Sequence, residues 1–141
     1  MKTVLTIYLR YVLIMTFLLM SVEYTSLTGK AQAQRVSSNQ WPVTYNKLKI
    51  DGLEIFYREA GDPLKPTILL LHGFPSSSHM FRNLIPLLAD KYHVVAPDYP
   101  GFGYSSAPAV SEYDYSFDQL ARVVDQFTVA KGLKKYSLYV Q

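Results

Sequence analysis

Two short apolar runs, each followed by a turn-rich loop and then by apolar residues at helical spacing, constrain the fold of this chain most strongly. The runs cover residues 67–71 (TILLL) and 92–96 (YHVVA). Continuous runs of this length are typical of strands that are buried on both faces of a sheet. A third run, residues 136–141 (YSLYVQ), begins another strand. Strands that alternate with helices predict a mostly parallel sheet with right-handed crossovers.

The segment before the first buried strand has the signature of an antiparallel hairpin. Residues 43–50 and 53–57 alternate between apolar and polar side chains, and Asp51-Gly52 joins the two runs. Asp-Gly in this position is the strongest short-range hairpin signal. The predicted fold class is therefore α/β over residues 43–141, with an antiparallel N-terminal hairpin on a mostly parallel sheet.

Two amphipathic helices are predicted between the strands. The first has apolar residues at helical spacing, namely Phe81, Leu84, Ile85 and Leu88. Pro86 lies within this pattern and is expected to bend or break the helix, because proline lacks a backbone donor. The second helix is expected to start after Ser116, a good N-cap, and to end near Lys131 and Gly132. Its predicted apolar face consists of Leu120, Val123, Val124 and Phe127.

The N-terminus resembles a secretory signal peptide. Lys2 and Arg10 precede the uncharged run 11–20, and the pattern Ala31-Gln32-Ala33 is typical of a cleavage site. Residues 1–33 are therefore predicted to be a signal peptide and residues 34–42 a leader into the domain, which implies an exported protein, secreted or periplasmic. An uncleaved membrane anchor is the alternative, because residues 21–30 form a long polar stretch.

Composition excludes several classes of function. The chain has no Cys, so a disulfide scaffold, a thiolate metal site and a Cys nucleophile are excluded. Of the 14 basic and 11 acidic residues, three basic and one acidic lie in residues 1–33, which leaves a net charge of +1 for the rest. A nearly neutral domain lacks the excess positive charge that is typical of nucleic-acid binding, so no nucleic-acid partner is predicted. The histidines (His72, His79 and His93) are not at metal-ligand spacing, so no metal site and no cofactor are predicted.

Two loop motifs follow the buried strands and carry the candidate chemistry. His72-Gly73-Phe74-Pro75 follows the first strand, and residues 97–103 (PDYPGFG) follow the second. In parallel sheets, ligands bind beyond the carboxyl ends of the strands, which is where both loops lie. Gly73 permits a close approach of the backbone to a bound group. The alternative interpretation of HGFP is a simple strand-to-helix turn.

These motifs, together with residues 115–127 (YSFDQLARVVDQF), resemble the N-terminal half of an α/β-hydrolase domain, in the branch of epoxide hydrolases and haloalkane dehalogenases. The resemblance covers residues 43–141 and stops before the nucleophile elbow of that fold. It implies that the Phe74 N–H is an oxyanion-hole donor and that the Phe74–Pro75 bond is cis.

The same resemblance assigns the other motif residues to shaping the loops. His72, Gly73 and Pro75 shape the first loop, and Asp98, Gly101 and Gly103 shape the second. His72 as a general base is the alternative, but the family's catalytic His comes late in the chain. Asp98 as a catalytic acid is likewise the less favoured interpretation. Ser105 lies in a sequence that lacks the pattern of a nucleophile elbow.

In this family the nucleophile follows the strand that here covers residues 136–141. The resemblance thus places the nucleophile directly after Gln141, and the catalytic acid and His later still. The 141 residues are expected to hold no catalytic residue and to be inactive alone. Val140-Gln141 favours an Asp nucleophile over Ser, and Phe74 favours an epoxide hydrolase over a dehalogenase.

Two alternatives stay open at this point. One is a non-catalytic truncated or split product that acts at most as a binding unit, and the other is a serine esterase or lactonase. The expected partner of the full-length protein is a small-molecule substrate. Self-association of the fragment is also expected, because its last strand would expose unpaired backbone groups.

Overall fold

The computed structural model describes residues 41–141 of the chain. The predicted signal peptide and its anchor alternative (residues 1–33), and all of the leader except residues 41 and 42, lie outside the described residues. No helix between residues 41 and 141 is long and apolar enough to cross a membrane.

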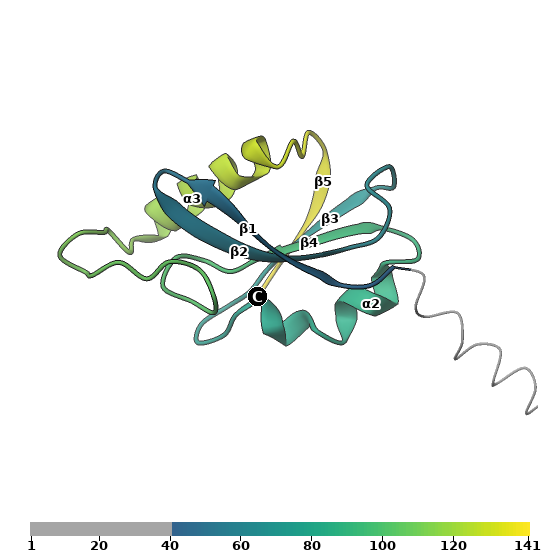
Figure 1. Ribbon diagram of the computed structural model, residues 1–141, viewed down its shortest axis with the longest axis horizontal. Helices are drawn as coiled ribbons and strands as arrows, with labels where there is room; N and C mark the ends of the chain where they lie inside the picture. The colour runs from purple at the N-terminus through teal and green to yellow at the C-terminus, as the bar shows by residue number, and fades with distance from the viewer. Residues whose placement is uncertain (1–40) are drawn as a thin grey trace, which may run out of the picture. The chain divides into compact units, whose positions relative to one another are not determined.

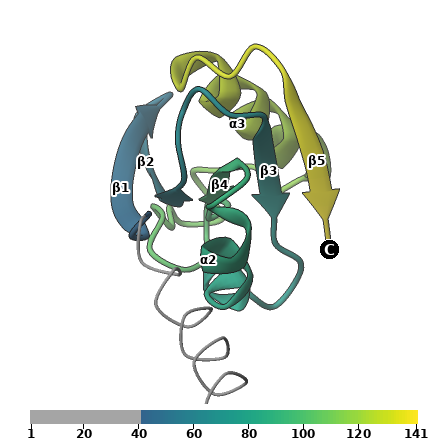
Figure 2. The same ribbon diagram turned by 90° about the vertical axis from the view of Figure 1, so that its right-hand side faces the viewer.

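Five strands form one open, mixed sheet in the order β1-β2-β4-β3-β5. The strands are β1 (Thr44–Ile50), β2 (Leu53–Ala60), β3 (Thr67–Leu71), β4 (His93–Pro97) and β5 (Tyr136–Val140). The pairings β1–β2 and β2–β4 are antiparallel, whereas β4–β3 and β3–β5 are parallel. Only β2 therefore runs against the other four strands, and β5 lies at one edge of the sheet (Figure 2).

The predicted hairpin is confirmed, and its turn explains the register. Asp51 and Gly52 both have positive φ angles, 47° and 83°, which is the requirement of a tight two-residue turn that matches strand twist. Ile50 consequently pairs with Leu53 directly across the turn. β2 continues to Ala60, three residues beyond the predicted end at residue 57.

Helices cover the two faces of the sheet (Figure 1). The helix α3 (Phe117–Ala130) lies on one face, where its buried Val123 and Phe127 pack with Leu69 and Val95. On the other face, η2 (Ser78–Phe81) and α2 (Leu84–Leu88) contribute a second apolar cluster. Trp41 packs against this second cluster.

The first predicted helix is broken, as expected, but the break lies before Pro86 and not at it. The chain leaves η2 at Arg82 and starts α2 at Leu84, so that Pro86 lies inside α2 and not at its end. Pro86 is tolerated there because the first N–H groups of a helix have no acceptor within the helix. The prediction of α3 is confirmed: the Ser116 hydroxyl accepts a hydrogen bond from the Gln119 N–H, and Gly132 follows the helix with a φ of 75°.

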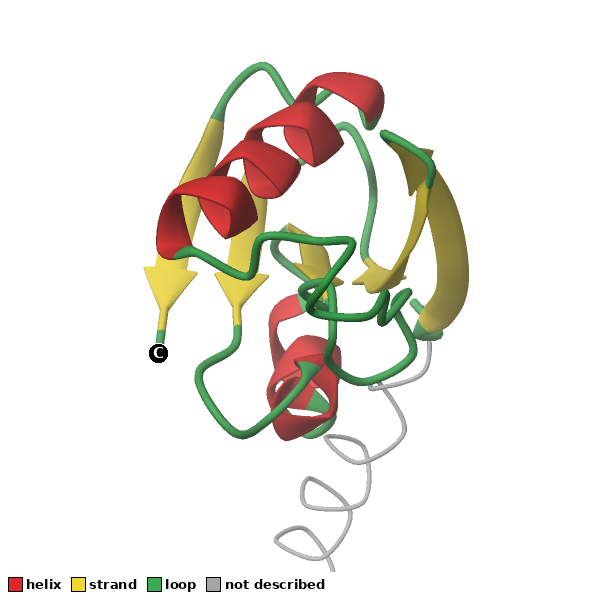
Figure 3. Cartoon of the chain, turned by 90° about the vertical axis from the view of Figure 1, so that its left-hand side faces the viewer, coloured by secondary structure: helices red, strands yellow, loops and turns green. Residues whose placement is uncertain are grey.

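The parallel strands bring three chain segments together at their carboxyl ends. β3 leads into His72, β4 leads into Asp98, and β5 leads into Gln141. Figure 3 shows the carboxyl ends of β3 and β5 side by side. The fold thus places both loop motifs and the last residue of the sequence together.

Candidate functional site

A cleft of about 460 Å³ lies at the carboxyl ends of β3 and β5. The HGFP loop forms one side, and α3 forms another. Its walls are predominantly apolar; they include Phe74, Phe102, Phe117, Leu120, Val124, Leu138 and Val140. A concave, mostly apolar site with a few polar groups is the usual form of a small-molecule site.

Gly73 brings the HGFP loop into contact with the end of β5. A Cβ atom on Gly73 would lie 2.9 Å from the carbonyl oxygen of Gln141, which is closer than real side chains approach. The Gln141 N–H donates to the carbonyl oxygen of Leu71 at 3.2 Å and so continues the β3–β5 ladder. Only glycine permits this approach of the loop backbone to the chain beyond β5.

The side chain of Phe74 is exposed at the cleft, and its backbone N–H is the group of chemical interest. Its side chain is 87% exposed, and its bond to Pro75 is cis, as the resemblance implies. Among the hydrogen bonds of residues 41–141, none uses the Phe74 N–H as donor. This N–H is therefore available to an oxygen atom of a bound group, as an oxyanion-hole donor must be.

His72 is buried, at 2% exposed, and both of its ring nitrogens face backbone groups. Nε2 accepts a hydrogen bond from the Tyr99 N–H at 3.1 Å, and Nδ1 lies 3.1 Å from the carbonyl oxygen of Gly73. This arrangement suits a neutral imidazole protonated at Nδ1. No ring nitrogen is left to accept a proton from a substrate, so the geometry favours bracing of the loop over action as a base.

Asp98 links the second loop to the segment after HGFP. Its carboxylate is 1% exposed and accepts hydrogen bonds from the Ser78 N–H at 2.6 Å and the Tyr104 N–H at 2.9 Å. Gly103 has a φ of 54°, and any Cβ there would collide with this carboxylate. Asp98 thus holds two backbone segments together and does not reach the cleft, whose lining does not include it.

Further hydrogen bonds fix the second loop to β2. The Ser105 hydroxyl donates to the carbonyl oxygen of Asp98 at 2.7 Å and accepts from the Phe56 N–H at 2.9 Å. The Gly101 N–H donates to the carbonyl oxygen of Ser106 at 2.9 Å. Because the Ser105 hydroxyl is engaged on both sides, it is held as a structural group.

The predicted apolar face of α3 serves both the core and the cleft. Val123 and Phe127 are buried in the core, and Val124 packs against the same cluster. Leu120 and Val124 also line the cleft, together with Phe117. Residues 117, 120 and 124 share one face of the helix, adjacent to the face that packs in the core. Their spacing is the signal that could have identified this wall. Tyr99 also lines the cleft, and burial raises the pKa of its phenol above the ordinary value of 10.0.

The remaining histidines lie away from the cleft. His79 is exposed at the start of η2, and His93 is buried against Glu59, with Nε2 and Oε1 2.6 Å apart. Within residues 41–141, no three His, Asp or Glu side chains form a group that could hold a metal ion.

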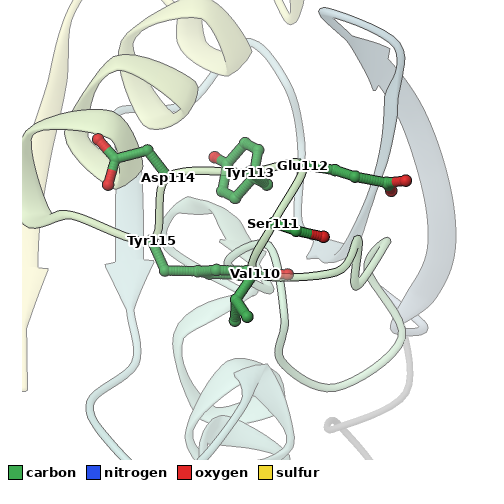
Figure 4. Close-up of a pocket in the computed structure, with 6 residues that line it drawn as sticks. All are labelled: Val110, Ser111, Glu112, Tyr113, Asp114 and Tyr115. Carbon is green, nitrogen blue, oxygen red and sulfur yellow. The ribbon is translucent and has the colours of Figure 1, made fainter.

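A separate hollow of about 500 Å³ is formed by the single loop segment 110–115 (Figure 4). Two of its polar side chains form hydrogen bonds close to the loop. Asp114 accepts hydrogen bonds from the Ser116 N–H and hydroxyl, and the Tyr115 hydroxyl donates to the carbonyl oxygen of Pro108. None of the predicted site residues lines this hollow.

Comparisons with known proteins agree with this geometry. The profile of the alpha/beta hydrolase fold family matches residues 66–140. An uncharacterized hydrolase of Saccharomyces cerevisiae is 47% identical over 97 residues, which cover 68% of this chain and 33% of the yeast protein. Epoxide hydrolase A of Mycobacterium tuberculosis is 47% identical over 66 residues, or 45% of this chain and 20% of that protein.

A solved structure gives the same result. The crystal structure of a loop variant of a haloalkane dehalogenase from Bradyrhizobium elkanii matches with a TM-score of 0.66 and 33% sequence identity, covering 70% of this chain and 32% of that chain. The chain spans about a third or less of the length of each of these proteins. It belongs to the α/β-hydrolase fold family, in the branch that resembles haloalkane dehalogenases and epoxide hydrolases.

Proposed function

We propose that this chain supplies the oxyanion-hole part of the active site of an epoxide hydrolase-like enzyme, whose nucleophile is an Asp directly after Gln141. One observation carries the proposal. The backbone of the HGFP loop lies against Gln141, with the Phe74 N–H unused by the described residues. The next residue of the chain would therefore enter the site beside a free donor.

The chemistry explains why the donor must lie close to the nucleophile. A carboxylate oxygen attacks an sp3 carbon of the epoxide, the C–O bond of the ring breaks, and an ester with the enzyme forms. Water then attacks the carbonyl carbon of that ester, and negative charge develops on the oxygen of the nucleophile's own carboxyl group. The Phe74 N–H would stabilise this oxyanion.

The walls of the cleft suggest the class of substrate. Within the described part of the chain, its lining includes no Lys, Arg, Asp or Glu. Aromatic and aliphatic side chains instead dominate it. This lining favours an uncharged organic molecule, which loses little hydration energy on entering an apolar site.

The choice between nucleophiles rests on the resemblance and is open to experiment. Val140-Gln141 is typical of relatives with an Asp nucleophile, and Phe74 of those that act on epoxides. The product of the whole reading frame, including any codons after Gln141, should hydrolyse styrene oxide faster than it releases halide from 1,2-dibromoethane. The 141-residue chain alone should show neither activity.

Isotope labelling distinguishes the mechanisms. In a single turnover in H₂¹⁸O, an Asp nucleophile delivers its own unlabelled oxygen to the diol, whereas direct attack by water labels the diol. Hydrolysis of p-nitrophenyl acetate without any epoxide turnover would instead support a serine esterase. Activity of the isolated 141-residue chain would contradict the proposal.

The role of the Phe74 N–H can be tested by a pair of variants. Phe74→Pro removes the N–H, and loss of one oxyanion donor typically lowers kcat by about 100- to 1000-fold. Phe74→Leu keeps the N–H and should retain most of the activity. Circular dichroism of both variants verifies that each is folded, and equal losses in the two would argue against a backbone role.

A further inference from the structure

We propose that Arg58 is the centre of a second binding site, which takes a small planar carboxylate bearing an aromatic group. The site lies on the α2 face of the hairpin. It shares no lining residue with the cleft beside Gln141 and does not depend on the proposed hydrolase function.

Arg58 is a buried cation without an ion-pair partner among the described residues. It is 6% exposed, and none of the ion pairs of residues 41–141 includes it. Glu54, on the same face of β2, instead pairs with Lys47 at 3.0 Å. Buried guanidinium groups are normally paired with an anion.

The hydrogen bonds of Arg58 also leave room for an anion. Nε donates to the Ser78 hydroxyl at 3.1 Å, and Nη2 lies 3.5 Å from Nδ1 of His79. Neither contact is with a carboxylate. A guanidinium has five N–H donors, so most of its planar fork has no acceptor among the described residues. A planar carboxylate matches that fork with two parallel hydrogen bonds.

Aromatic rings surround the guanidinium. Its Cζ atom lies 4.9 Å from the ring centroid of Tyr45 and 5.7 Å from that of Phe56. These rings stabilise a cation in part, but among the described residues no hydrogen bond joins either of them to the guanidinium. They are also the surface on which a second aromatic ring would stack.

These side chains line a hollow that is open to solvent. A pocket of about 360 Å³ is lined by Tyr45, Phe56, Arg58 and Tyr104. Tyr45 and Tyr104 are 62% and 67% exposed, so a ligand can reach the guanidinium from solvent between them. The combination of one planar cation and three aromatic walls selects an aromatic carboxylate.

Benzoate is the probe for this site, and the full chain is titrated with it while the Arg58 Nε–H resonance is followed by ¹⁵N NMR. Benzoate should shift that resonance saturably. Acetate lacks the ring and benzamide lacks the charge, so both should bind several-fold more weakly. Arg58→Met should lower benzoate affinity about tenfold or more.

Two further variants keep the result interpretable. Arg122→Met removes an exposed arginine of α3 and should leave benzoate affinity unchanged. Tyr45→Leu changes an exposed ring, which should spare folding, and should weaken benzoate binding more than acetate binding. Equal binding of benzamide and benzoate, unchanged affinity in Arg58→Met, or no saturable shift with benzoate would each overturn the proposal.

Discussion

At the scale of single residues, Asp98 shows how one buried carboxylate can organise two loops. One carboxylate oxygen accepts a hydrogen bond from the Ser78 N–H, and the other accepts one from the Tyr104 N–H. Asp98→Asn preserves the shape but replaces one acceptor oxygen by an NH₂ group, which then faces a backbone donor. We expect a loss of about 1–3 kcal/mol in the free energy of unfolding, the usual effect of leaving a buried donor unpaired. Urea denaturation measures it as a lower midpoint with an unchanged slope.

A matched control separates this effect from the loss of a negative charge. Asp90 is exposed, and its side chain makes no hydrogen bond with any residue between 41 and 141. Asp90→Asn should therefore change stability by less than about 0.5 kcal/mol. If the two variants unfold at the same urea concentration, Asp98 does not hold the loops.

At the scale of secondary-structure elements, Glu59 joins β2 to β4 and α3. Its carboxylate accepts hydrogen bonds from His93 Nε2 at 2.6 Å and from Lys131 Nζ at 2.9 Å. The hydrogen bond from His93, aided by the Lys131 ammonium and opposed by burial, holds the pKa of Glu59 below its ordinary value of 4.5. The ionised form is thus favoured in the folded chain.

The sign of the pH dependence follows from that shift. A carboxyl group with a lowered pKa in the folded state stabilises the fold above its unfolded pKa. That contribution is lost as the pH falls through the folded value. Glu59→Gln should therefore be less stable than the parent chain at neutral pH, and the difference should shrink below pH 4.5. Thermal unfolding across this range tests it, with the exposed Glu112→Gln as control. A difference that stays constant down to pH 2 would contradict the assignment.

The elements also differ in how far local sequence predicts them. Residues 67–71 and the Asp51-Gly52 turn are predicted correctly, because burial pattern and turn chemistry are local properties. The last three residues of β2 are not, since Arg58 and Glu59 interrupt the apolar pattern. Their side chains form hydrogen bonds with Ser78, His93 and Lys131, which are distant in sequence. The antiparallel pairing of β2 with β4 joins segments that are far apart in the sequence, so local patterns do not predict it.

At the scale of the whole molecule, the same limit applies to the candidate site. The HGFP motif is a local pattern, and three of its residues, His72, Gly73 and Phe74, line the cleft. The contact of Gly73 with Gln141 depends on the β3–β5 pairing, which joins residues far apart in the chain. Leu120 and Val124 have the same helical periodicity as the core residues Val123 and Phe127, so the sequence of α3 alone does not show which apolar residues also line a cleft.

The exposed edge strand gives the last prediction. Among the described strands, β5 pairs only with β3, and all five of its residues are exposed, including Leu138 at 55% and Val140 at 59%. Unpaired backbone groups beside apolar side chains are a template for association with a second chain. We therefore propose that the 141-residue chain by itself self-associates through β5.

Analytical ultracentrifugation over a range of concentrations tests this proposal. The double variant Leu138→Lys, Val140→Lys should shift the chain toward monomer, because paired like charges on an edge strand oppose association. Leu64→Lys removes an equally apolar side chain that is 94% exposed in a turn remote from β5 in the sequence, and it should leave the oligomeric state unchanged. Association that persists in the double variant, or that Leu64→Lys abolishes equally well, would place the contact elsewhere. A parent chain that is monomeric at every concentration would show that the edge alone does not drive association, even with its backbone groups unpaired.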